Sequence, residues 1–172
     1  MKPLYSVQEL HVARLQGILR QYGSALDSSS TGCGKTICAA EIARGHDGPV
    51  LVICPKAVIP AWKRELEERG VAAEVINYEK IRTGKTSLGG WGPRGKVWMW
   101  KLPARSLVIF DEAHKCAGIG TQNSKLLAES KDRYKVLMLS ATIASSPLQM
   151  HAAGWVLGLH GLGNFYQWAT QY

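Results

Sequence analysis

The residue types best suited to chemistry occur in the segment Ser-Thr-Gly-Cys-Gly-Lys-Thr at positions 30–36. Gly32 and Gly34 carry no Cβ, so the backbone amides around them can curl about phosphate oxygens without a clash. Lys35 is then expected to reach the β- and γ-phosphates of a nucleotide, and the Thr36 hydroxyl to ligate Mg²⁺. The segment therefore predicts a loop that binds a nucleotide through its phosphates.

The flanks of this loop are those that such a motif requires. A short apolar stretch, Ala25–Leu26, precedes it, and a helix predicted from Lys35 to about Arg44 would aim its N-terminal amides at the anion. The backbone of Thr31 and Cys33 completes the predicted cradle. Ser29 stands where the motif commonly has its first glycine, and a small side chain is expected to be tolerated there. The alternative is a glycine-rich turn that binds no ligand.

Two adjacent carboxylates follow a second apolar strand, predicted at Leu107–Phe110. Asp111 and Glu112 then stand at the carboxyl end of that strand, the edge at which open α/β sheets bind ligands. We expect Asp111 to hold Mg²⁺ through water, and Glu112 to orient and deprotonate an attacking water. Adjacent acids at a strand end can instead cap a helix, but the phosphate loop favours the hydrolytic role.

The elements that must position these residues alternate between strands and helices. Strands are expected at 25–26, 49–54, 73–76, 107–110 and 136–139. Helices are expected at 6–22, 35–44, 58–69, 123–131 and, with glycine breaks, after Pro147. The apolar residues near helical spacing in the first helix are Val7, Leu10, Leu15, Ile18 and Leu19. The alternation predicts an α/β fold with a mostly parallel sheet and helices on both faces.

Composition narrows the class of protein. The chain has 172 residues, which is enough for one domain that folds without a disulfide or a metal. Hydrophobic residues make up 46% of it, a share too high for a disordered tail. No run approaches about 18 apolar residues, so no membrane contact is expected, and the absence of an apolar signal core favours the cytoplasm. The four cysteines form no C-x-x-C pair and are expected to be reduced thiols. The net charge of +8 favours an acidic partner, nucleic acid first.

Three motifs in order resemble motifs I, II and III of superfamily 2 helicases and translocases. They are the phosphate loop, Asp-Glu-Ala-His at 111–114 and Ser-Ala-Thr at 140–142. The finer resemblance is to the Swi/Snf-like branch, in a form similar to phage-encoded members. The segments that resemble that branch's motif Ia and the segment after it are Cys54-Pro55-Lys56 with Trp62 and Glu65, and Asn77-Tyr78-Glu79.

This resemblance implies a RecA-like P-loop NTPase domain that binds ATP and Mg²⁺ and drives movement on nucleic acid, usually duplex DNA. Such motors need a second RecA-like domain, in cis or in trans, and nothing after Thr142 resembles its motifs. The chain, 1–172, is therefore expected to be the first domain only, with weak or no hydrolysis alone, in the cytoplasm of a bacterial or phage-infected cell.

Two other functions stay open on the sequence. One is a nucleotide- or nucleic-acid-binding module without turnover, which the missing second domain favours. The other is a P-loop enzyme that acts on a small molecule, such as a kinase. Ser-Ala-Thr at 140–142 and Pro55-Lys56 argue against the small-molecule enzyme.

The resemblance also implies roles for residues around the predicted nucleotide. Gln8 resembles the glutamine that reads adenine, and Gln16 is the second candidate for that role. His114 with Ser140 or Thr142 would couple the γ-phosphate site to the nucleic-acid side through a hydrogen bond. The alternative for these three residues is a satisfied polar contact at strand ends.

Nucleic-acid contacts are expected at two places. Lys56 stands where the family contacts a phosphate backbone, although a solvated lysine at a helix start would look the same. Segment 80–105 carries seven cations and no acid, and residues at about 83–105 are expected to form a basic, tryptophan-rich insertion with a small hairpin. The residues expected to contact nucleic acid there, by phosphate contact and stacking, are Arg94, Lys96 and Lys101 with Trp91, Trp98 and Trp100. Tryptophans that merely cover the sheet are the alternative.

The C-terminal stretch, Val136–Tyr172, contains no formal charge. Part of it is expected to cover the sheet. We expect the rest to pack on a second domain or a partner chain, because exposed apolar patches mark contact sites.

Overall fold

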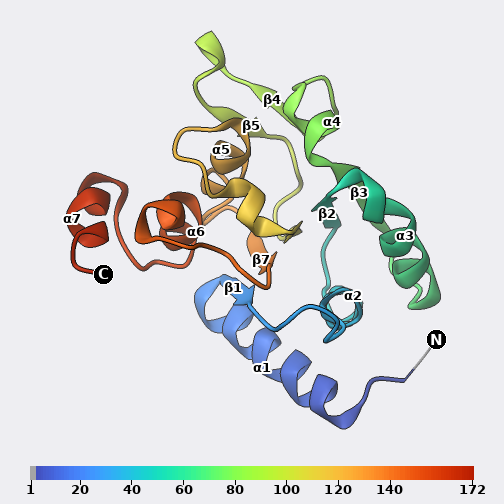
Figure 1. The fold of residues 1–172 in the computed structure, drawn as a ribbon. Coiled ribbons are helices and arrows are strands. Elements are labelled where there is room, and N and C mark those ends of the chain that lie inside the picture. Colours follow the sequence, from blue (N-terminus) through green and yellow to red (C-terminus); the bar gives the residue numbers. More distant parts are fainter. Residues whose placement is uncertain (1–2) are drawn as a thin grey trace.

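Five parallel strands form one sheet, in the order β1-β7-β6-β2-β3, in a computed structural model that describes residues 3–172 (Figure 1). The strands are β1 (Ser24–Asp27), β2 (Val50–Cys54), β3 (Ala73–Asn77), β6 (Leu107–Asp111) and β7 (Lys135–Leu139). The helices are α1 (Ser6–Tyr22), α2 (Lys35–Arg44), α3 (Ile59–Glu68), α4 (Tyr78–Arg82), α5 (Gln122–Ala128), α6 (His151–Val156) and α7 (Phe165–Ala169). The predicted α/β fold is confirmed.

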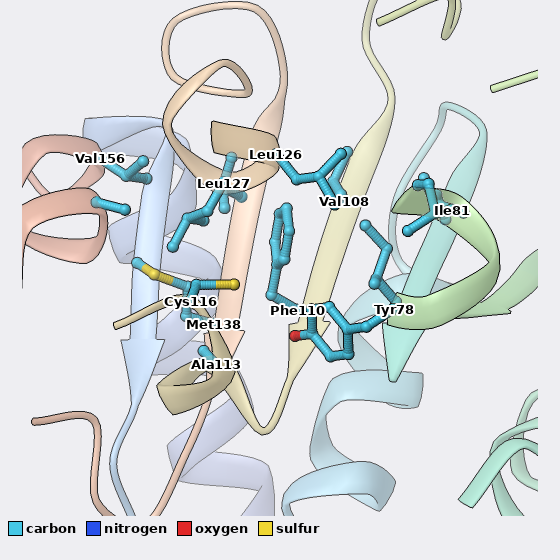
Figure 2. Packing of buried hydrophobic residues seen from close by; sticks show 14 of the residues in the cluster. Tyr78, Ile81, Val108, Phe110, Ala113, Cys116, Leu126, Leu127, Met138 and Val156 are labelled. Carbon is cyan, nitrogen blue, oxygen red and sulfur yellow. The ribbon is translucent and has the colours of Figure 1, made fainter. Parts of the chain in front are cut away.

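Helices cover both faces of the sheet. One apolar cluster joins α1, α2 and α3 to one face and includes Ile109 and Leu137. The other cluster joins α4, α5 and α6 to the opposite face and includes Val108 and Phe110 (Figure 2). Successive residues of β6 thus point to opposite faces and are buried on both, which explains why this strand is apolar without interruption.

Helix α1 has the predicted bounds but a different buried face. It ends at Gly23, whose φ of 76° lies in the left-handed region that a glycine adopts without strain. Its buried side chains are Val12, Leu15 and Leu19. Val7 and Leu10 are each 75% exposed, so the expectation that they belong to the apolar face is wrong. The first turns of α1 therefore receive little apolar anchoring.

The basic segment forms the predicted hairpin, with β4 (Gly89–Trp91) antiparallel to β5 (Trp98–Trp100). Trp98 and Trp100 are buried in the cluster that covers the sheet, and the Trp100 indole donates to the carbonyl of Leu126 at 3.3 Å. Stacking of these two tryptophans on nucleic acid is therefore wrong, and they cover the sheet instead. The partly buried Trp91 indole donates to the carbonyl of Arg82 at 2.8 Å.

The C-terminal stretch divides into a buried and an exposed part. Ala152, Ala153 and Val156 of α6 are buried against the sheet, and the Ser24 hydroxyl donates to the Val156 carbonyl at 2.9 Å. Phe165 of α7 is buried in a group of rings with His151, His160 and Trp168. The large apolar side chains left exposed beyond residue 147 are Leu148, Leu159, Leu162, Tyr166 and Tyr172.

All four cysteines are free thiols, of which Cys33 is exposed and the others are buried. Within residues 3–172, no three acidic, histidine or cysteine side chains gather as a metal-ion site. In the same residues, every helix is too short or too polar to cross a membrane.

Candidate nucleotide-binding site

The predicted phosphate loop connects β1 to α2 and depends on two glycines. Gly32 and Gly34 have φ values of 81° and 82°, a left-handed conformation that strains any residue with a Cβ. A Cβ on Gly34 would lie 2.6 Å from Nε2 of Gln8. The loop therefore needs glycine at position 34 for its left-handed backbone, and the Gln8 side chain lies close against it.

Lys35 holds its charge inside this loop. Its Nζ donates to the carbonyl oxygens of Ser29 at 2.7 Å and Ser30 at 2.9 Å. The side chain therefore turns back over the loop rather than extending along α2. This places a cation beside the amides at the N-terminus of α2, the combination that attracts phosphate.

Of the two glutamines considered for adenine, only Gln8 lies at the loop. Its Nε2 donates to the Cys33 carbonyl at 3.3 Å, and its Oε1 accepts from the Tyr5 amide at 3.1 Å. Gln16 lies at the other end of α2, where its Nε2 would be 2.9 Å from a Cβ on Gly45. The geometry is thus compatible with Gln8 and not with Gln16.

Asp111 ends β6 and is held on both oxygens. Its Oδ2 accepts from the Trp62 indole at 2.7 Å, and its Oδ1 accepts from the Glu112 amide at 3.0 Å. Burial raises the pKa of Asp111, while the Trp62 donor and the Lys35 ammonium lower it.

Trp62 and Tyr78 are the site residues whose roles sequence reasoning missed. Trp62 is fully buried in the core, and its indole also fixes the acid. The Tyr78 hydroxyl donates to the backbone carbonyl of Asp111 at 2.8 Å and points toward the end of β6 (Figure 2). Both lie in the segments that resemble family motifs, and that resemblance was the one available signal.

Glu112 and His114 follow the strand end in an unusual backbone conformation. Glu112 has φ 51° and ψ 51°, a left-handed geometry that costs a non-glycine residue about 1–3 kcal/mol. Oε2 of Glu112 lies 3.2 Å from Nδ1 of His114, and the same ring nitrogen lies 3.2 Å from the Ser140 hydroxyl. The expected contact of His114 therefore occurs with Ser140, while Thr142 is exposed.

Parallel pairing brings these residues to one edge of the sheet. Asp27 pairs with Leu139, and Asp111 pairs with the same residue from the other side. The Ser140 amide then donates to the Asp27 carbonyl at 3.1 Å. The phosphate loop, the acids and the Ser140 turn thus follow three neighbouring strands at their carboxyl ends, where α/β sheets bind ligands.

The donor set at this edge fits a magnesium nucleotide. Thr36, in the first turn of α2, and Asp111 offer a hydroxyl and a carboxylate, the hard oxygen ligands that Mg²⁺ prefers. The left-handed glycines at 32 and 34 let the loop curve without strain. Thr31 and Cys33 are exposed in this loop.

The candidate nucleic-acid residues lie in two separate places. Lys56 is exposed at the start of a short 3-10 helix that follows β2, at the same carboxyl edge as the site. Arg94 and Lys96 are exposed between the two strands of the hairpin, and Lys101 directly follows β5. Figure 1 shows the turn of this hairpin projecting from the body of the molecule.

No protein-family profile matches the sequence. A protein of Acanthamoeba polyphaga mimivirus, named "Putative ATP-dependent RNA helicase L364", is 36% identical in an alignment 165 residues long. The match covers 83% of this chain and 31% of that protein. The chain thus spans about a third of this relative, and less than two fifths of each of two solved structures among those that it resembles.

Those two structures are ATPase and helicase domains from archaea. The SWI2/SNF2 ATPase core of Sulfolobus solfataricus, in complex with dsDNA, has a TM-score of 0.70 at 18% identity, over 99% of this chain and 39% of that one. The Hef helicase domain of Pyrococcus furiosus has a TM-score of 0.55 at 20% identity, over 88% and 36%. By fold, the chain is a RecA-like domain of the kind found in helicase and SWI2/SNF2 ATPase cores.

Proposed function

We propose that this chain is the ATP-binding half of an ATP-dependent helicase or translocase. It would be the first RecA-like domain, 1–172, of a superfamily 2, DEAH-box enzyme. The observation that carries the proposal is the convergence of three groups at one sheet edge: the Lys35 loop, the Asp111–Glu112 pair and the His114–Ser140 contact. A small-molecule kinase would not need that last contact.

The proposed roles follow from position. Lys35 and the loop amides bind the phosphates, and Thr36 and Asp111 hold Mg²⁺, which neutralises charge on the transferred group when bound. Glu112 orients water and accepts its proton. His114 would transmit the state of the γ-phosphate site to the turn that follows β7, through Ser140.

The finer assignment is to the Swi/Snf-like branch, in its phage-type form, working in the cytoplasm of a bacterial or phage-infected cell. Duplex DNA is the favoured partner, supported by the likeness to a SWI2/SNF2 core solved with dsDNA. The name of the mimivirus relative mentions RNA, so RNA is the partner to test against. A second RecA-like domain, in cis or in trans, would complete the hydrolytic site.

The surface proposed for nucleic acid combines Lys56 with the basic insertion at about 83–105. Lys56 is exposed and lies at the edge that holds the nucleotide site. Arg94, Lys96 and Lys101 are exposed on the hairpin, so their charges are free to meet phosphates. The tryptophans beneath them serve to anchor the hairpin.

Calorimetry with ADP, ATP and Mg²⁺ tests the site. Lys35→Ala should weaken binding at least tenfold, or about 1.4 kcal/mol, because it removes the cation held over the loop. Glu112→Gln is the matched control, since it keeps the shape of a side chain at the same edge and should leave binding nearly unchanged. Equal affinity in the unaltered chain and Lys35→Ala would refute the site.

The second candidate function is a binding module without turnover. It is favoured by the phosphate loop, whose Lys35 ammonium and backbone amides could bind a nucleotide without any group that hydrolyses it. Phosphate release measured with and without duplex DNA or RNA, on the chain alone and joined to a second RecA-like domain, separates the two functions. Turnover in the joined protein that Glu112→Gln abolishes would support the motor.

A further inference from the structure

A buried carboxylate lies beside the site and has no role in the chemistry proposed above. Asp27, the last residue of β1, is 1% exposed. Its Oδ1 accepts from the amide of Ser29 at 3.0 Å and from the Ser29 hydroxyl at 2.6 Å. Its Oδ2 lies 3.1 Å from Nε2 of His11 on α1. An unpaired carboxylate this deep would be costly, so these contacts are needed to keep it.

The carboxylate is ionised in the folded chain. Burial by itself raises the pKa of Asp27, but the hydrogen bonds from Ser29 and the contact with His11 together bring it below its usual value. The negative charge is therefore a permanent feature of the site at neutral pH. It contacts Ser29 of the loop and His11 of α1.

Through Ser29, Asp27 reaches the phosphate side of the site. Ser29 is fixed by two hydrogen bonds to the carboxylate, and its carbonyl accepts from Nζ of Lys35 at 2.7 Å. The position of the lysine thus depends on the same acid that binds His11.

Through His11, Asp27 reaches the base side. His11 lies three residues after Gln8, close to one turn of helix, and Gln8 donates to the carbonyl of Cys33 in the loop. Val7 and Leu10 are exposed, so no large apolar side chain between Leu4 and Val12 is buried against the core. The polar contact between His11 and Asp27 is accordingly well placed to set how closely Gln8 approaches the loop.

We infer that His11 and Asp27 are a positioning pair that docks α1 on the phosphate loop and so determines selectivity for the adenine base. The inference rests on the proposed nucleotide site. His11 would act through Gln8 without touching the nucleotide, while Asp27 would also order the loop that receives the phosphates.

The test compares three probes by calorimetry in the presence of Mg²⁺: ADP, GDP and inorganic pyrophosphate. His11→Ala should lower the affinity for ADP about fivefold and leave the affinity for pyrophosphate within about twofold of its original value. The ratio of ADP affinity to GDP affinity should therefore fall. His11→Gln, whose amide can still donate toward Asp27, should restore most of the ratio. Asp27→Asn should weaken both ADP and pyrophosphate. Arg14→Ala, exposed on the same helix, is the matched control.

The outcomes are separable. If the unaltered chain binds neither ADP nor pyrophosphate, the proposed function fails and this inference fails with it. If the unaltered chain binds both and His11→Ala keeps the original ADP-to-GDP ratio, the inference alone is overturned. A parallel loss of ADP and pyrophosphate in His11→Ala would also overturn it, because that pattern belongs to general damage of the loop.

Discussion

Asp111 illustrates how a functional residue can oppose stability. Its carboxylate is mostly buried, and burial raises its pKa, so the folded chain binds a proton there more tightly than the unfolded chain does. The ionised form therefore costs folding free energy at neutral pH. The Trp62 indole offsets part of that cost and fixes the orientation of the carboxylate.

Asp111→Asn should accordingly stabilise the fold while abolishing Mg²⁺-dependent nucleotide binding. Asparagine keeps the acceptor for the Trp62 indole, gives up the acceptor for the Glu112 amide and removes the buried charge. We expect the melting temperature to rise by about 2–4 °C at pH 7, which is about 1 kcal/mol for a domain of this size. The gain should shrink as the pH falls, because the raised pKa of Asp111 makes the native aspartate take up a proton before the unfolded chain does. Asp47→Asn, at an exposed carboxylate, should change neither quantity. An equal gain in that variant would contradict the role of burial at Asp111.

The hairpin combines an apolar anchor with a charged outer surface. Trp98 and Trp100 stack edge to face at 5.5 Å, and Trp100 meets Tyr134 at 6.3 Å in the same way. Between them, Met99 points outward and is 53% exposed. The alternation of β5 thus buries the rings and leaves the cations of the hairpin in solvent.

Neutralising Arg94, Lys96 and Lys101 should flatten the salt dependence of duplex binding. Three lost phosphate contacts lower the slope of log affinity against log salt by about 2.7. Fluorescence anisotropy over a salt series measures this slope. Neutralising the exposed Arg14, Arg20 and Arg133 removes the same charge elsewhere and should leave the slope closer to its original value. If the two triple variants have the same slope, the hairpin cations make no special contact with nucleic acid and are only solvated.

At the scale of the whole molecule, apolar surface remains open near the C-terminal end. Leu159, Leu162 and Tyr166 are 51%, 47% and 65% exposed, and residues 136–172 contain no charge to keep copies apart. Buried α6 residues and Phe165 show that the same stretch also completes the core. The buried part of this stretch therefore completes the core, and its exposed apolar part is suited to contact with another domain or chain.

The chain should self-associate or bind a hydrophobic dye through this exposed part. Changing Leu159, Leu162 and Tyr166 to serine should lower dye binding, and joining a second RecA-like domain should suppress it. Light scattering and dye fluorescence provide the measurement. Val7→Ser with Leu10→Ser, on exposed apolar residues of α1, is the matched control. A dye-negative monomer at high concentration would show that no such contact surface exists.

The sequence by itself determined the features that depend on neighbours along the chain. The phosphate loop needs left-handed glycines at 32 and 34, and the helix that begins at Lys35 is local to it. Apolar runs bounded by turn residues predict the parallel strands. Asp111, Glu112 and Ser140 stand at the ends of two of these runs, so they are predicted at the carboxyl edge of the sheet. These are short-range properties of backbone conformation and burial.

Only the tertiary structure decided which side chains meet across elements. The helical spacing of apolar residues predicts the bounds of α1 correctly. Which of its side chains are buried depends on how α1 packs against β1 and α2, and this packing buries Val12 and leaves Val7 and Leu10 exposed. The bonds of Trp62 to Asp111 and the contact of His11 with Asp27 join residues far apart in the chain. The residue type determines whether a side chain can donate a hydrogen bond. Which acceptor it meets depends on how whole helices are oriented against the sheet.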